Sequence, residues 1–230
     1  DLHSFPTRRS SDLEIGGAII SLGSLTLNNV TFINNTANYY GGDILAVEVN
    51  CFDCKFMDSY SVLGSSIYSK LGTANIERCN FTSKYSSQWA TVFAQNSNLF
   101  INDCLFNNLS SSYAPAIYVN EGNVPINNTK FNKLKAYKTA GAVGIKECEL
   151  AIIQNCLFTN TCSVKNGGAV YIDTVAGGTV DAPMVYVINS TFVNASSSFG
   201  GAFVQLSGNL TIKDSNFTNC SSNYGGGAVY

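Results

Sequence analysis

The sequence has few of the residues that metal centres, general-base catalysts and nucleic-acid-binding surfaces depend on. It contains one histidine, His3, and 12% of its residues are charged, with a formal net charge of −2. Apart from the lysines between Lys130 and Lys138, no basic cluster occurs, so the composition does not favour binding to nucleic acid or to acidic membranes. No apolar run approaches the roughly 18 residues needed to cross a bilayer, and we expect no membrane span.

The first thirteen residues differ from everything that follows. They read DLHSFPTRRSSDL, which matches the in-frame translation of a common sequencing-library adapter. We therefore interpret residues 1–13 as non-native and leave them out of the fold argument. Without them the chain has no histidine and one arginine, Arg78. The predicted organisation is a non-native leader, 1–13, and one repeat domain, 14–230.

A repeat of about 25 residues runs through this domain, and two markers keep its phase. Successive phenylalanines are 24, 25, 25, 25, 27, 34 and 25 residues apart. About nine residues after each comes a step of small residues, followed by apolar and often aromatic residues; Gly167–Tyr171, GGAVY, is one of the clearest. The marker phenylalanines are Phe32, Phe56, Phe81, Phe106, Phe131, Phe158, Phe192 and Phe217.

The residues before each phenylalanine follow a strand pattern. Apolar residues stand seven and five positions before it, as Leu99 and Ile101 do before Phe106. A spacing of two places both side chains on one face of a strand. The residue three positions before the phenylalanine is Asn or Asp in all repeats except the one with Arg78. Asn and Asp tolerate the left-handed backbone of a tight corner, so we expect a corner there.

These observations predict an all-β fold, a right-handed parallel β-helix (solenoid) of about eight rungs of roughly 25 residues. Helical repeats are disfavoured because the apolar spacing is two and β-branched residues, glycine and asparagine are frequent. The phenylalanines should stack from rung to rung. Because the repeat starts at Gly16 and continues to Tyr230 without a polar cap, we expect a fragment that is open at both ends and that aggregates when expressed alone.

The paired motifs resemble the repeats of polymorphic outer-membrane proteins of the chlamydial type. Phe-x-Asn occurs at Phe32-Ile33-Asn34, Phe158-Thr159-Asn160 and Phe217-Thr218-Asn219, and the Gly-Gly-Ala motif is clear at Gly167, Gly200 and Gly226. The second to fourth rungs depart from it, with Ser, Ala or Pro in place of glycine. The resemblance implies a pectate-lyase-like β-helix in a surface-displayed, adhesive or passenger-type protein.

No set of residues predicts catalysis. Glycosidases need two carboxylates that converge on one face, whereas the acidic residues here are scattered. Asp53 and Asp103 share the corner position with Arg78 between them, and we interpret them as structural. Lys146, Glu147 and Glu149 resemble most closely the calcium-binding and basic groups of a lyase, and we interpret them as a solvated strand edge. We therefore assign no catalytic, cofactor-binding or metal-binding residue, and no binding residue can be named.

The eight cysteines are interpreted mainly as core residues. Cys54, Cys79 and Cys104 occupy one inward position on consecutive rungs, and Cys51-x-x-Cys54 has the spacing of two core positions. No second pair or histidine completes a zinc site, and buried thiols behave as small apolar side chains. A Cys79–Cys104 disulfide stays open as an alternative. The polar-loop residues Cys162 and Cys220 are better candidates for oxidation.

Two further features bear on secretion and recognition. Asn-x-Ser/Thr triplets suggest glycosylation in a secreted protein, most credibly in loops. The segment Asp173–Met184 lengthens one rung, and it is either a recognition loop or a tolerated insertion. The triplets begin at Asn29, Asn34, Asn80, Asn108, Asn127, Asn189, Asn194, Asn209, Asn216 and Asn219.

The sequence therefore favours a non-catalytic extracellular or cell-surface repeat module for adhesion or surface structure. Its expected partners are host or environmental glycans or surface proteins, without nucleic acid or cofactor. The alternative is a fragment of a carbohydrate-active β-helix enzyme, a polysaccharide lyase or glycoside hydrolase, whose catalytic rungs lie outside the sequence. Fold alone does not separate the two.

Overall fold

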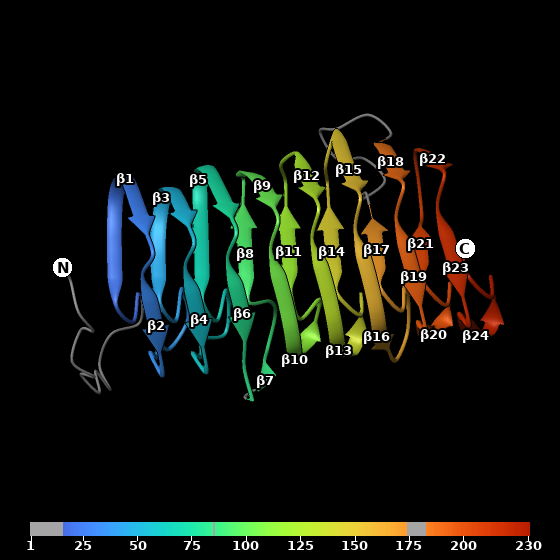
Figure 1. Cartoon of the computed structure of the whole chain (residues 1–230), viewed down its shortest axis with the longest axis horizontal. Helices are drawn as coiled ribbons and strands as arrows, with labels where there is room; N and C mark the ends of the chain where they lie inside the picture. The colour runs from blue at the N-terminus through green and yellow to red at the C-terminus, as the bar shows by residue number, and fades with distance from the viewer. Residues whose placement is uncertain (1–15, 85, 174–182) are drawn as a thin grey trace.

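The computed structural model describes residues 16–84, 86–173 and 183–230, and the elements in these ranges are strands, β1 to β24. Paired strands run parallel and stack along the long axis, with the first and last strands, β1 and β24, at opposite ends of the stack (Figure 1). The predicted all-β parallel solenoid of about eight turns, spaced by about 25 residues, is confirmed.

One sheet of 13 strands covers two sides of the solenoid. In the first rungs one long strand spans both sides, whereas later rungs use a separate strand for each side. We call the side that follows the small-residue step face A and the next side along the chain face B. The long strands are β1 (Ile19–Asn28), β3 (Ile44–Phe52) and β5 (Ile67–Glu77). Face A continues with β8 (Val92–Gln95), β11 (Ile117–Asn120), β14 (Val143–Lys146), β17 (Val170–Asp173) and β21 (Phe203–Gln205). Face B continues with β9 (Asn98–Asn102), β12 (Val124–Asn127), β15 (Leu150–Gln154), β18 (Met184–Ile188) and β22 (Asn209–Lys213).

A second sheet of 11 strands, face C, carries the marker phenylalanines. Its main strands are β2 (Thr31–Ile33), β4 (Lys55–Met57), β6 (Asn80–Thr82), β10 (Leu105–Tyr113), β13 (Lys130–Thr139), β16 (Leu157–Ser163), β19 (Thr191–Val193) and β23 (Asn216–Thr218). Shorter strands extend it: β7 (Ser86–Ser87), β20 (Ser196–Phe199) and β24 (Ser221–Gly225).

The eight phenylalanines form one continuous stack, as the period predicted. Each is the direct partner of the next across neighbouring strands, as Phe81 is of Phe106. Neighbouring ring centroids lie 4.5 to 5.2 Å apart and the ring planes are nearly parallel, with interplanar angles of 1° to 5°. The six rings from Phe56 to Phe192 are at most 1% exposed. This stack and the apolar residues of faces A and B that point inward make up the core.

The predicted Asn/Asp corner is confirmed. All eight residues three positions before the phenylalanines have φ between 46° and 57°, including Arg78 at 52°. The structure adds a second left-handed corner two residues after most of the phenylalanines, for example at Asn34 and Asn160 (φ 55° and 54°). A third lies at the first residue of the small-residue step, such as Gly167 (φ 63°). A further left-handed corner joins face A to face B in several rungs, as at Asn96 and Glu121 (φ 49° and 64°), and together these corners let the short strands turn around one core.

Candidate functional site

Asp53, Arg78 and Asp103 hold the same corner position on successive rungs. Arg78 donates from Nε to Asp53 Oδ1 at 2.8 Å and also pairs with the neighbouring Glu77. The hydrogen bond from Arg78 holds the pKa of Asp53 below its usual value. Asp103 adds only a longer-range charge interaction with Arg78. Both members of the Asp53–Arg78 pair are more than two-fifths exposed, so this is a surface ion pair at a corner.

Lys146, Glu147 and Glu149 lie where β14 turns into β15. Glu147 is a corner residue with φ 56°, and its carboxylate is 3.5 Å from Lys146 Nζ. Glu149 is exposed. Among the residues that the structure describes, no group of three or more His, Cys, Asp or Glu side chains is placed to hold a metal ion.

The inward cysteines act as hydrogen-bonding residues as well as apolar ones, which the sequence argument missed. The backbone N–H of Cys54 donates to Cys79 Sγ, and that of Cys79 donates to Cys104 Sγ, both at 3.4 Å. Thr129, Ser190 and Ser215 accept in the same way on other rungs. The sequence did contain a signal for this role, because Cys, Ser and Thr all carry a heteroatom at the γ position that can accept a hydrogen bond. This atom satisfies a buried backbone N–H beside the corner, where the backbone hydrogen bonds between neighbouring strands are interrupted.

The eight cysteines are free thiols, so a Cys79–Cys104 disulfide is not present. Burial raises the pKa of Cys156 to about 12 and that of Cys148 to about 11. Cys162 and Cys220 are the two that are partly exposed, which fits the expectation that they are the easier ones to oxidise.

The acceptor asparagines of the glycosylation triplets lie largely at exposed corners. Asn29, Asn34, Asn108, Asn189, Asn194 and Asn219 all have positive φ and are exposed. The side-chain amides of Asn189 and Asn194 donate to Asn155 and Asn160 on the preceding rung. A glycan on either nitrogen would disturb such a ladder bond. Of the long excursion, residues 174–182 lie outside the described part of the chain.

A row of aromatic side chains lies on the outer side of face A. Tyr68, Phe93 and Tyr118 occupy one outward register on successive rungs, and adjacent ring centroids are 5.5 and 5.2 Å apart. Trp89 stacks on Tyr113 at 4.4 Å and meets Tyr118 edge-on at 4.8 Å. We call these five residues the aromatic strip. The sequence hinted at it, because aromatic residues often follow the small-residue step.

The aromatic strip ends at a notch on the next rung. Gly144 lies in register between Tyr118 and Tyr171, so this rung contributes no side chain at that outward position. The resulting cavity of about 230 Å³ is lined by Trp89, Tyr113, Tyr118, Thr139, Ile145, Lys146, Tyr171 and Asp173. Burial, followed by the charge of Asp173, raises the pKa of both Tyr118 and Tyr171 to about 12, so their hydroxyls are neutral and can donate.

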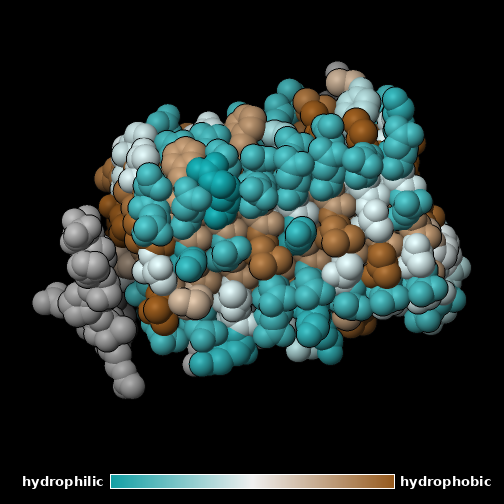
Figure 2. Space-filling view, viewed as in Figure 1, coloured by the Kyte–Doolittle hydropathy of each residue, from teal (hydrophilic) through white to brown (hydrophobic). Residues whose placement is uncertain are grey.

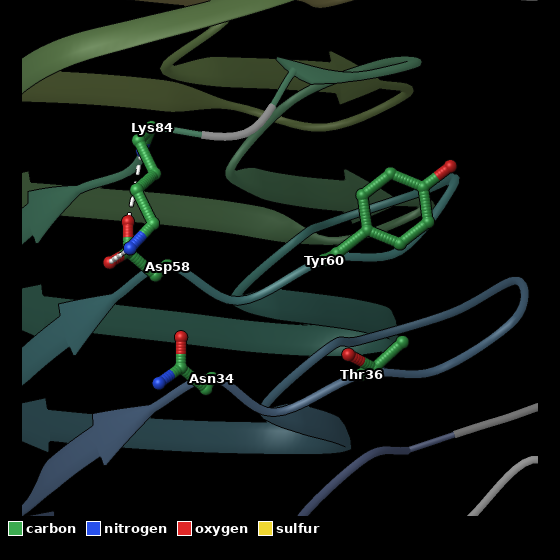
Figure 3. Close-up of a pocket in the computed structure, with 5 residues that line it drawn as sticks. All are labelled: Asn34, Thr36, Asp58, Tyr60 and Lys84. Atoms are coloured by element: carbon green, nitrogen blue, oxygen red, sulfur yellow. Dashed lines mark hydrogen bonds and ion pairs between the residues drawn. The ribbon is translucent and has the colours of Figure 1, made fainter. Parts of the chain in front are cut away.

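A second, more polar groove lies near the N-terminal end. Asn34, Thr36, Asp58, Tyr60 and Lys84 line it, with a volume of about 490 Å³ (Figure 3). Lys84 and Asp58 point toward each other and form an ion pair of 3.2 Å, whereas the Tyr60 ring lies apart from them. The lining therefore consists mainly of loop side chains that are already paired or well solvated, without an aromatic wall.

One buried acid stands where most rungs have alanine. Asp43 is 0% exposed; Asn35 and Ser59 donate to its Oδ1 at 2.7 and 2.6 Å, and Oδ2 has no hydrogen-bond partner. Burial raises its pKa from 3.8 to about 7. Asp43 lines neither the notch nor the second groove, and its enclosed carboxyl bears on the stability of the fold.

Comparisons with protein-family models, with curated proteins and with solved structures find no match to this chain. In the described residues, no helix is long and apolar enough to cross a membrane.

Proposed function

We propose that this protein is a non-catalytic extracellular or cell-surface repeat module that acts in adhesion or as surface structure. The observation that carries the proposal is the aromatic strip with its adjoining notch, displayed on a rigid scaffold. Trp89, Tyr113 and Tyr118 are partly exposed, whereas Tyr68 and Phe93 pack beside them and are buried. Aromatic side chains that are grouped and partly exposed on a protein surface commonly mark a site of interaction.

The scaffold supports this role because it keeps the strip in place without a ligand. The residues inward of the strip, such as Ile67, Val92 and Ile117, are fully buried in the core. The strands β5, β8 and β11, which carry Tyr68, Phe93 and Tyr118, are each hydrogen-bonded to neighbours on both sides. A surface that is already ordered loses little conformational freedom on binding. Glycans and surface proteins are the proposed partners.

The surface as a whole suits an extended adhesive module. Figure 2 shows apolar patches in a band along the molecule, between hydrophilic margins. The charged fraction is low, so contacts would depend on aromatic, hydroxyl and amide groups more than on ion pairs.

The proposal is tested by adhesion and by accessibility. Beads coated with the whole chain should adhere to cells or extracellular matrix, and adhesion should fall by more than half in Trp89→Ala. Tyr224→Ala is the matched control, since Tyr224 is 76% exposed on β24, which pairs with β20 and carries no residue of the strip or the notch. An antibody to the chain should also label intact, non-permeabilised cells that produce it.

The enzyme alternative makes a different prediction. Release of reducing ends or unsaturated uronates from polysaccharides by the protein would contradict the non-catalytic assignment. Labelling that requires permeabilisation would contradict the extracellular one.

A further inference from the structure

We infer that the notch beside Gly144 is a binding site for one neutral pyranose ring of a glycan. This inference deepens the proposed adhesive function, on which it rests, by naming the ligand class and the residues that recognise it.

The notch exists because a glycine interrupts a row of rings. The Tyr118 ring leans over Gly144, and a Cβ at residue 144 would lie 2.9 Å from Tyr118 Cδ2 and 3.0 Å from Ala114 Cβ. A larger residue would push the ring outward and fill the hollow. With glycine, the hollow stays open between Tyr118 on one rung and Tyr171 two rungs later.

The walls of the notch match the two kinds of surface on a pyranose, its apolar C–H face and its polar hydroxyl groups. Trp89, Tyr113 and Tyr118 supply aromatic carbon from one side, and the C–H face of a pyranose packs against such rings. Lys146, Asp173 and Thr139 supply the donors and acceptors that sugar hydroxyls require. The Tyr171 hydroxyl already donates to Asp173 Oδ2 at 3.1 Å, which orients that carboxylate. Small-molecule sites commonly combine an apolar wall with a few polar groups in this way.

The balance of charge favours a neutral sugar over an acidic one. Lys146 faces the carboxylate of Glu147, and Lys138 is held by the Tyr113 hydroxyl at 2.8 Å and lies over that ring. Asp173 contributes a negative charge at the rim. An anionic glycan or a nucleic acid would therefore meet no excess of positive charge.

The size favours one ring over a longer segment. A cavity of about 230 Å³ is below the roughly 300–1,000 Å³ of pockets that enclose drug-sized ligands. A proline-rich peptide, which also docks on aromatic walls, needs a longer groove. One ring of a chain can enter the notch while its neighbours lie on the outer surface.

The site contains its own reporter, because Trp89 is the only tryptophan in the chain. We would titrate the whole chain with cellohexaose, mannohexaose and chitohexaose while recording Trp89 emission. Affinity electrophoresis in gels that contain soluble neutral polysaccharides, or polygalacturonate, would give an independent readout. A proline-rich peptide serves as the competing probe.

The expected result is saturable change in Trp89 emission and retarded migration with at least one neutral glycan. Tyr171→Ala should weaken binding by roughly tenfold, as for truncation of a central aromatic contact. Tyr171→Phe, which keeps the ring, should lie between this variant and the wild type. Tyr60→Ala, in the second groove, should bind as the wild type does. Unchanged emission of the free variants verifies that they are folded around Trp89.

The inference would be overturned if only the proline-rich peptide or only polygalacturonate gave a saturable response in Trp89 emission or gel migration. It would also be overturned if no ligand changed either readout. Loss of binding in Tyr60→Ala instead of Tyr171→Ala would also overturn it by moving the site to the second groove. These outcomes are separate from the adhesion test: cell-surface adhesion without glycan binding refutes only the ligand. Glycan binding accompanied by glycan cleavage refutes only the non-catalytic assignment.

Discussion

Asp43→Asn should make the protein more stable at alkaline pH than the wild type. The carboxyl of Asp43 is fully buried and its pKa is raised from 3.8 to about 7. Asparagine keeps an oxygen that can accept from Asn35 and Ser59 but carries no ionisable group. The substitution therefore isolates the effect of ionising a carboxyl inside the solenoid.

The sign and size follow from the two pKa values. When the folded pKa is the higher one, the group favours folding fully below the unfolded pKa, and this contribution is lost as pH rises toward the folded pKa. The window is thus from about pH 3.8 to about pH 7. The folded and unfolded pKa values of Asp43 differ by about three pH units. At roughly 1.4 kcal/mol per pH unit, ionisation lowers the free energy of unfolding by about 4 kcal/mol.

Urea unfolding followed by circular dichroism between pH 4 and pH 8 measures this loss. The new amide nitrogen stands where Oδ2 has no partner, which costs about 1–3 kcal/mol at every pH; the diagnostic quantity is therefore the slope with pH. Wild type should lose stability over the window while Asp43→Asn loses about 4 kcal/mol less. Asp214→Asn is the control, because Asp214 is exposed at a corner where other rungs have asparagine, and it should follow the wild type. Parallel curves for wild type and Asp43→Asn would refute the reasoning.

Three further predictions concern the core. Phe106→Ala removes a fully buried ring with stacked neighbours on both sides and should lower the free energy of unfolding by roughly 3–5 kcal/mol. Phe217→Ala removes a ring with one stacking neighbour and should lower it by less; equal losses for the two variants in chemical denaturation would contradict the stacking argument. Cys79→Ser should unfold at nearly the wild-type urea concentration, whereas Cys79→Ala should lose about 1–3 kcal/mol of the free energy of unfolding, because alanine leaves the Cys54 N–H unsatisfied. Similar urea midpoints for the two variants would exclude a hydrogen-bonding role for the Cys79 sulfur. A thiol-specific reagent should label Cys162 and Cys220 in the folded protein and the six buried cysteines only in denaturant, and early labelling of a buried thiol would show that the core opens.

Much of the fold could be predicted from local patterns. The two-residue spacing before each phenylalanine assigned the inward side chains, and residues such as Leu99 and Ile101 are indeed buried. The Asn/Asp corner was predictable because tolerance of the left-handed conformation belongs to the residue itself. The second corner, at residues such as Asn34, resembles an ordinary polar loop in the sequence. Its asparagines were visible, but nothing in the sequence told a corner residue from a loop residue.

The candidate site was far less predictable. Its residues belong to different rungs and different faces: Trp89 and Tyr113 lie at the end of face C, whereas Tyr118, Lys146 and Tyr171 belong to face A. The phase of the repeat predicts which residues occupy equivalent positions on successive rungs of one face. It does not say which side chains from neighbouring faces meet at an edge, so the notch came into view only with the ring and cavity geometry.

The period, the parallel register and the side chains that form the core can be predicted from the residues alone, because alternation along a strand and the preferences of Phe, Asn and Gly are local properties. The folded arrangement of the rungs was needed to show which outward rings meet, that a hollow lies beside Gly144, and that Asp43 is enclosed beside Asn35 and Ser59. These features depend on contacts between residues about 8 to 80 positions apart, and on the exclusion of water that such contacts bring about.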